Sequence, residues 1–146
     1  MRILLVNGPN LNTLGSREPD IYGTTTLAEI VDAVTARAAA LGADVRAFQA
    51  NGEGQIIDWL QREQGDAAGL VINAGALTHY GIALRDAVAA CGLPTVEVHI
   101  SNIWRRERFR HRSLLSPVVT GAIVGLGAEG YVLAVEGLVQ IIQGAE

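Results

Sequence analysis

The chain has 146 residues, of which 49% are hydrophobic and 18% charged, and its net charge at neutral pH is -4. This length suits one domain with a hydrophobic core, so we expect a single domain over residues 1–146. The acidic balance argues against a nucleic-acid partner or an anionic membrane surface. The low charged content indicates that part of the surface is buried between subunits.

The absence of lysine restricts the kinds of catalysis and ligand binding that the chain can carry out. All 11 basic residues are arginines, which excludes Schiff-base catalysis and P-loop lysines. The single cysteine, Cys91, excludes an internal disulfide framework. The apolar run after Met1 is too short for a signal peptide, and no run is long enough to span a bilayer. We therefore expect a cytoplasmic protein with no membrane partner.

Hydrophobic periodicity predicts strands that alternate with helices along the chain. The expected strands cover residues 3–6, 45–49, 69–73, 95–100 and 118–124. The expected helices cover residues 27–41, 53–64, 81–90 and 128–143. Thr26 and Glu29 form a capping-box pair at the first helix, and Asn51 is expected to cap the second.

This alternation predicts an α/β fold, a flavodoxin-like, doubly wound sheet of five parallel strands with helices on both faces. In such sheets ligands bind outside the carboxyl ends of the strands, beside the first strand. Polar residues follow three of the predicted strands at those ends, in the segments 7–22, 73–79 and 99–112. Their convergence on one edge indicates a functional site there.

The connection between the first strand and the first helix is unusually long, at about twenty residues where 2–6 are common. Residues 15–24 are expected to form a lid that carries Arg17 and Tyr22. A free tyrosine has a pKa of about 10, so it needs nearby positive charge to act as a base at neutral pH. Arg17 supplies that charge in one interpretation; in the other, Tyr22 only packs on the rim of the sheet.

Glu97 and His99 lie two residues apart in one predicted strand, so their side chains point to the same face. A carboxylate beside an imidazole fixes its tautomer and keeps it competent for proton transfer. The residues alone leave a buried structural histidine equally open. His79 is either a helix cap or a ligand contact. The wide spacing of the histidines disfavours a metal site.

Two further motifs have competing interpretations. The arginines between residues 105 and 112 form either a solvated connection, with Glu107 pairing locally, or a contact to an anionic or hydroxyl-rich ligand. Gly125 to Gly130 match the pattern G-x-G-x-x-G. Because this motif follows the last predicted strand, a tight turn and close helix–sheet packing explain it better than a dinucleotide site. No cofactor is expected.

Together these segments resemble one family, the type II 3-dehydroquinate dehydratases, or type II dehydroquinases. The resemblance covers essentially the whole chain. It rests on NGPNLNTLGSREPDIYG at 7–23, FQANGEG at 48–54, VINAGALTHYGIALRDA at 71–87, EVHISNIWRRERFRHRS at 97–113 and GAIVGLGAEGYVLA at 121–134. The first and fourth stretches are long and specific.

The resemblance implies a hydro-lyase that converts 3-dehydroquinate to 3-dehydroshikimate through an enolate, in the shikimate or quinate pathway, without a Schiff base. Tyr22 looks like the base, Arg17 like the group that lowers its pKa and stabilises the transition state, and Asn10 like the holder of a water against the enolate oxygen. His99 looks like the acid that protonates the departing hydroxyl, and Glu97 like the group that orients it.

The same resemblance implies a substrate-binding set and an assembly. Asn73, His79 and Arg110 match the positions that bind ring hydroxyls, and the backbone of Ile100 and Ser101 matches the carboxylate site. Asp86 matches a residue that family trimers lend to a neighbouring subunit. The implied assembly is a homododecamer, a tetramer of trimers.

The chain departs from the family at Ala74, where a proline is usual, and at Leu77, where a tyrosine is usual. We expect a looser loop at Ala74 and one contact fewer near the site at Leu77. Two rival functions remain from the residues alone. A flavodoxin-like module would bind FMN or another phosphate ligand. A structural subunit would keep all its measurable properties when Tyr22 or His99 is replaced.

Overall fold

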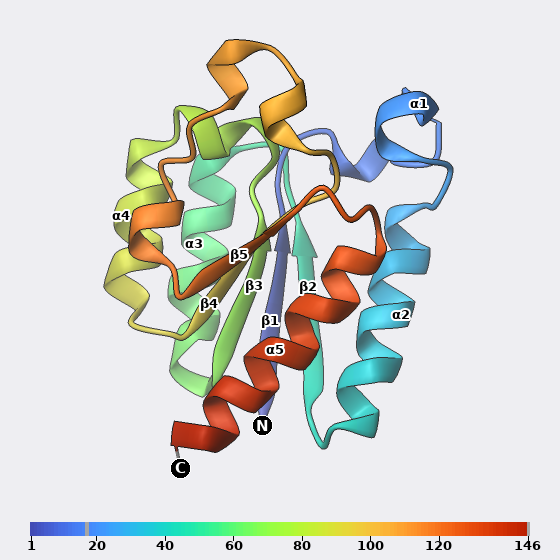
Figure 1. Ribbon diagram of the computed structural model, residues 1–146. Coiled ribbons are helices and arrows are strands. Elements are labelled where there is room, and N and C mark those ends of the chain that lie inside the picture. Colours follow the sequence, from blue (N-terminus) through green and yellow to red (C-terminus); the bar gives the residue numbers. More distant parts are fainter. Residues whose placement is uncertain (17, 146) are drawn as a thin grey trace.

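The computed structural model describes residues 1–16 and 18–145, and these form one parallel sheet covered by helices (Figure 1). The strand order is β2-β1-β3-β4-β5, and every neighbouring pair is parallel. The strands are β1 (Arg2–Asn7), β2 (Asp44–Gln49), β3 (Gly69–Asn73), β4 (Thr95–His99) and β5 (Gly121–Val124). The predicted α/β architecture with five parallel strands is confirmed.

Four helices of ten or more residues cover the sheet. They are α2 (Leu27–Ala40), α3 (Glu53–Glu63), α4 (Ile82–Cys91) and α5 (Glu129–Ala145). Helices α2 and α5 pack on one face, and α3 and α4 on the other (Figure 1). The sheet is therefore doubly wound, as the sequence predicts.

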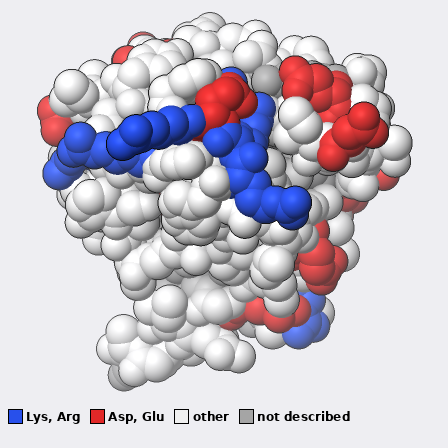
Figure 2. Space-filling model, turned by 45° about the horizontal axis from the view of Figure 1, so that its top comes forward, with Lys and Arg blue, Asp and Glu red and all other residues white. Residues whose placement is uncertain are grey.

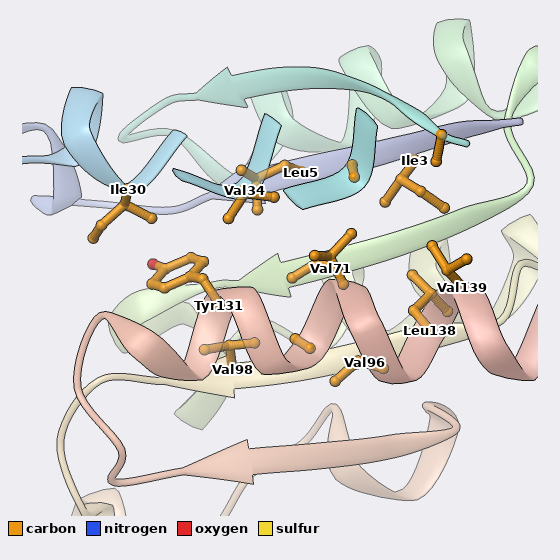
Figure 3. Close-up of a cluster of buried hydrophobic side chains, with 14 of the residues drawn as sticks. Ile3, Leu5, Ile30, Val34, Val71, Val96, Val98, Tyr131, Leu138 and Val139 are labelled. Carbon is orange, nitrogen blue, oxygen red and sulfur yellow. The ribbon is translucent and has the colours of Figure 1, made fainter. Parts of the chain in front are cut away.

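The alternation of side chains along the central strands builds two separate cores. Ile3 and Leu5 of β1 point toward α2 and α5, where Val34 and Tyr131 join them (Figure 3). Leu4 and Val6, their neighbours in sequence, point toward α3 and α4. Because β1 and β3 are buried on both faces, their positions are fixed, and so are the residues at their carboxyl ends.

The long first connection is more ordered than a simple loop. It contains a short 3₁₀ turn at Leu11–Thr13 and the one-turn helix α1 (Pro19–Tyr22). Pro19 begins α1 because proline has no N–H to leave unsatisfied at a first helical position. Gly23 ends it with φ 78°, a backbone conformation that glycine adopts without strain.

Two local expectations are wrong. Residues 118–120 do not belong to β5; Ser116–Val118 form a 3₁₀ turn instead, in which Val118 N–H donates to Leu115 O. Pro117 lies in the first turn of this 3₁₀ segment, where its missing N–H costs no hydrogen bond. Asn51 does not cap α3, because Gly52 occupies the N-cap position and Asn51 bonds elsewhere. Among the described residues, no helix combines the length and apolarity needed to cross a bilayer.

Candidate active site

A pocket lies at the carboxyl ends of β1, β3 and β4, where the polar segments predicted from the sequence converge. These strand ends share one edge of the sheet (Figure 1). In the view that brings this edge forward, arginine side chains form a band across the surface with an acidic side chain among them (Figure 2). The described lining of the pocket is Pro9, Asn10, Leu11, Tyr22, Asn73, Gly75, Ala76, His79, His99, Ile100, Ser101, Ile103, Arg106 and Arg110. Seven of the residues assigned from the sequence thus share one pocket with Tyr22.

Glu97 and His99 form a buried pair at the end of β4, as their spacing predicts. His99 Nε2 lies 2.5 Å from Glu97 Oε2, and the two side chains are 6% and 0% exposed. An ionised carboxylate can only accept, so Nε2 carries the proton of this hydrogen bond and Nδ1 is left for other chemistry. The predicted contact between the two side chains is confirmed.

Two serine hydroxyls complete the surroundings of Glu97, and the sequence analysis missed both. Ser113 Oγ donates to Glu97 Oε2 at 2.6 Å, and Ser116 Oγ donates to Oε1 at 2.7 Å. Burial alone would raise the pKa of the Glu97 carboxyl, but the hydrogen bonds from His99 and the serines outweigh burial and hold its pKa below the usual range. Glu97 is therefore an ionised, buried carboxylate at neutral pH.

Tyr22 meets an arginine, but not one that the sequence analysis singled out. Arg106 Nη1 donates to the Tyr22 hydroxyl at 2.8 Å, and its guanidinium carbon lies 5.3 Å from the centre of the tyrosine ring. Arg106 comes from the connection after β4, so it approaches α1 from a segment distant in sequence. Arg17, to which the sequence assigns this role, lies outside the described residues.

Asn10 reaches the pocket through an unusual backbone conformation. Its φ is 68°, in the left-handed region that only a few residue types tolerate, asparagine among them. The backbone N–H of Asn10 donates to Asn51 Oδ1 at 3.0 Å, which ties the loop to the end of β2. Asn51 also accepts from Gln49 Nε2. The residue expected to cap a helix thus fixes the loop that presents Asn10.

Asn73 is oriented by a buried hydrogen-bonded chain. Gly75 N–H donates to Asn73 Oδ1, so the Nδ2 end of the amide faces the Tyr131 hydroxyl, to which it donates at 2.7 Å. The tyrosine proton is then directed to Asn7 Oδ1, also at 2.7 Å. A backbone N–H can only donate, so Gly75 sets the direction of the whole chain.

His79 also lines the pocket and is held as a neutral imidazole. Its Nδ1 lies 2.8 Å from the carbonyl oxygen of Arg112, so Nδ1 carries the proton and Nε2 is an acceptor. Burial lowers the pKa of His79, which favours the neutral form. The alternative role as a helix cap is wrong, because the His79 ring bonds the Arg112 carbonyl and the Glu53 carboxylate accepts from Leu84 N–H in the first turn of α4. The third histidine, His111, hydrogen-bonds the carbonyl oxygen of Arg106 through its Nε2.

Arg110 is both a local ion-pair partner and a pocket residue, so the expected pairing with Glu107 is confirmed and the contact to a ligand stays a prediction. Its Nε donates to Glu107 Oε2 at 2.9 Å, and its side chain lines the pocket. Ile100 and Ser101 line the same pocket just beyond β4. Gly127 N–H donates to Ile100 O, so the glycine motif braces this segment.

The glycine motif is a tight turn, as expected. Gly125 and Gly127 have φ values of 87° and 66°, and a Cβ on Gly125 would lie 3.1 Å from the side chain of Asn102. At Gly130 a Cβ would lie 3.4 Å from Ile123, which reflects close helix–sheet packing.

Besides Glu97, three sequence-derived residues lie away from the described pocket lining. Asp86 is exposed on α4, outside this chain's own pocket. Leu77 is 3% exposed and belongs to the core beside α3 and α4, and the expected loss of a site contact there stays a prediction. Ala74 is fully buried, and its carbonyl group approaches Gly8 so closely that a Cβ there would clash. Within residues 1–16 and 18–145, no cluster of metal-ligating side chains is found.

Comparison with known proteins identifies the family. The model of the family described as dehydroquinase class II matches residues 1–139. The 3-dehydroquinate dehydratase of Roseiflexus castenholzii is 56% identical over 138 residues, covering 94% of this chain and 88% of that protein. The catabolic 3-dehydroquinase of Aspergillus clavatus is 54% identical over 134 residues, covering 92% and 89%. The crystal structure of type II dehydroquinase from Propionibacterium acnes superposes with a TM-score of 0.91 at 45% identity, covering 95% and 96%. The chain belongs to the class II dehydroquinase family.

Proposed function

We propose that this pocket dehydrates 3-dehydroquinate to 3-dehydroshikimate with Tyr22 as the base and His99 as the acid. Membership of the family makes the chain a hydro-lyase, a type II 3-dehydroquinate dehydratase. The observation that carries the assignment of roles is that both side chains line one pocket, each with a partner suited to its role. Tyr22 has the Arg106 guanidinium, and His99 has the Glu97 carboxylate.

The reaction begins with removal of a carbon-bound hydrogen next to the ketone. The Tyr22 phenolate takes this proton, and the electron pair left behind forms an enolate. Arg106 supports this role because a guanidinium that donates to the phenolic oxygen stabilises the phenolate form. Arg17 remains our proposed second cation, which stabilises the transition state.

The enolate needs a hydrogen-bond donor beside its oxygen. We assign to Asn10 the task of holding a water there, as an oxyanion-type contact. The fixed left-handed conformation of Asn10 and its tie to Asn51 support this assignment, because preorganised donors need no reorganisation during the reaction.

The second half of the reaction expels the hydroxyl group. The enolate electrons reform the ketone and a new carbon–carbon double bond, and the hydroxyl leaves as water with a proton from His99 Nδ1. Glu97 stabilises the imidazolium that this step requires. A proton then passes from Tyr22 to His99 through solvent, which restores both groups.

The substrate-binding assignments follow the pocket lining. We propose that Asn73, His79 and Arg110 bind ring hydroxyls, and that the backbone of Ile100 and Ser101 binds the carboxylate. The support is that all five line the pocket with the reacting groups. His79 Nε2 is oriented as an acceptor for a substrate hydroxyl, since Nδ1 donates to Arg112 O.

We further propose a cytoplasmic homododecamer, a tetramer of trimers, in which Asp86 enters a neighbour's site and residues 15–24 act as the lid of a single domain. Support for a subunit contact at α4 comes from its exposed face: Ile82 is 65% exposed, one helical turn from exposed Asp86. The proposed context is the shikimate pathway of aromatic biosynthesis, or quinate breakdown.

The test is a turnover assay with 3-dehydroquinate followed by ultraviolet absorbance, since the product is a conjugated enone acid. We expect absorbance to rise whether or not borohydride is present, because the chain has no lysine to form a reducible Schiff base. Tyr22→Phe should lower turnover by about 10²–10⁴-fold. Calorimetric titration should show that the variant still binds substrate. Near-wild-type turnover in Tyr22→Phe would remove Tyr22 from the role of base.

A further inference from the structure

Two hydroxyl groups donate hydrogen bonds to the Glu97 carboxylate, and the proposed mechanism gives neither of them a role. We propose that Ser113 and Ser116 are positioning residues for the general acid: their hydroxyls hold both oxygens of Glu97 so that the carboxylate orients His99. The inference rests on the proposed role of His99 as the acid. It adds that the general acid depends on residues 113–116, which follow the arginine-rich connection at residues 105–112.

Ser113 is held so that its proton can point only toward Glu97. Its Oγ accepts from the backbone N–H groups of Leu115 and Ser116, both at 3.1 Å. With these donors on its lone pairs, the hydroxyl directs its own proton to Glu97 Oε2 at 2.6 Å. This is the same oxygen that accepts from His99, so Ser113 fixes the atom on which the imidazole is aligned.

The Ser116 hydroxyl donates to the other carboxylate oxygen, Glu97 Oε1, at 2.7 Å. Its side chain makes no second hydrogen bond among those of the described residues. The residue is exposed, whereas Ser113 is only partly so. Water can therefore take the place of the Ser116 hydroxyl more easily than that of Ser113. The two serines together prevent the carboxyl group from rotating about its last bond.

The segment that carries the serines is anchored in the core. Leu115, between them, is fully buried among residues packed by α3 and α4. Thr120 N–H donates to Thr95 O, and Thr95 N–H donates to the Thr120 hydroxyl, which joins the end of this segment to the start of β4. A rigid support is what a positioning contact requires, because a loose donor would let the carboxylate move.

Burial makes the hydroxyl donors necessary. A fully buried carboxylate loses its water, and each remaining oxygen lone pair needs a donor. The other ionisable groups that face the pair are His79, whose ring stacks 6.5 Å from that of His99, and the pocket arginines Arg106 and Arg110. None of these three makes a hydrogen bond to Glu97 in the described part of the chain.

The experiment compares Ser113→Ala, Ser116→Ala and the double variant with the wild type. We expect kcat to fall by about 10-fold for Ser113→Ala, less for Ser116→Ala and about 100-fold for the pair, from the loss of hydrogen bonds to a charged group. KM should stay within about twofold, because neither serine lines the described pocket. Ser116→Thr keeps the hydroxyl and should restore activity.

The pH profile separates positioning from a general loss of structure. The donors lower the pKa of Glu97, so their removal raises it, and the carboxylate becomes ionised only at higher pH. The acidic limb of kcat against pH should therefore move to higher pH in the double variant. The control is Thr35→Ala, which removes a hydroxyl bonded within α2 and should change neither kcat nor the limb.

Either of two results overturns the inference. One is an unchanged kcat and acidic limb in the folded double variant. The other is a loss of kcat that follows the loss of thermal stability and that Ser116→Thr does not restore. Failure of the proposed function looks different: a His99→Gln enzyme would then keep its turnover. If His99→Gln is inactive while the double serine variant behaves as wild type, only the role of the serines fails.

Discussion

The two side chains that we propose as acid and base are positioned in opposite ways. His99 ends a central strand, is 5% exposed, and meets its carboxylate partner two residues away in the same strand. Tyr22 ends a one-turn helix in a long connection, and its arginine partner is 84 residues away in sequence. The proposed acid thus lies within the sheet, whereas the proposed base and Arg106 come from two different connections.

This difference has a mechanistic meaning. Strand register cannot change without moving a whole face of the core, so the Glu97–His99 pair stays fixed through the reaction. A loop-borne base can approach and leave the substrate as the loop moves. An elimination that forms an enolate first and expels water second can use one group of each kind. The variants below test whether the two halves act separately.

The largest effect is expected from His99→Gln. Glutamine can still donate to Glu97, but it cannot deliver a proton, so turnover should fall by about 10²–10⁴-fold. Removal of the substrate hydrogen should continue, because Tyr22 and Arg106 are untouched. Mass spectrometry of substrate recovered from deuterated buffer should show deuterium incorporation without product formation.

The matched comparison is Tyr22→Phe, which should lose both exchange and turnover. Equal loss of exchange and turnover in a folded His99→Gln enzyme would contradict the separation into a strand-borne acid and a loop-borne base. Persistence of deuterium exchange in Tyr22→Phe would also contradict this separation, because the exchange would then not need the proposed base.

A smaller effect is expected from Arg106→Gln, on the base half alone. The side chain of Arg106 is 14% exposed, and it donates to the Tyr22 hydroxyl. A hydrogen bond to a charged group is worth about 1.5–3 kcal/mol, so turnover should fall by about 10–100-fold. The pH–rate profile should move to more alkaline pH. Steady-state kinetics across pH measures both.

Arg105→Gln is the control for Arg106→Gln, because it removes an arginine from the adjacent, exposed position. Its turnover and pH–rate profile should match those of the wild type. If the two variants behave alike, the effect comes from the net charge of the segment, and the contact with Tyr22 carries no special weight.

The same contrast explains what the sequence could predict. Alternation within a strand is a local rule, so the placement of Glu97 beside His99 followed from their spacing alone. The partner of Tyr22 depends on how the arginine connection folds back over α1, and nothing local distinguishes Arg106 from its neighbours. Proximity in sequence suggested Arg17, which lies outside the described residues, and the tertiary structure adds Arg106.

The serines and Tyr131 were missed for a related reason. In the sequence, Ser113 and Ser116 look like ordinary turn residues. Their contact with Glu97 arises only in the folded chain, where the buried Leu115 anchors their segment. Tyr131 falls in the apolar face of α5, where its ring is expected in the core. The core does hold the ring (Figure 3). Its hydroxyl nevertheless hydrogen-bonds two asparagines at the strand ends.

The smallest effect we expect comes from Tyr131→Phe, which tests the framework on the strand-borne side. The change leaves Asn7 Oδ1 and Asn73 Nδ2 without their shared partner at positions only 1% and 3% exposed. Unfolding free energy should fall by about 1–3 kcal/mol, the cost of buried polar groups left unpaired, as measured by denaturant titration. Since the amide of Asn73 loses its orientation and the reacting groups do not, KM should rise while kcat is largely kept. Tyr80→Phe, at a tyrosine that is 63% exposed, should change neither quantity. A Tyr131→Phe enzyme with wild-type KM would mean that Gly75 alone suffices to orient Asn73, and the buried chain would then serve the fold and not the site.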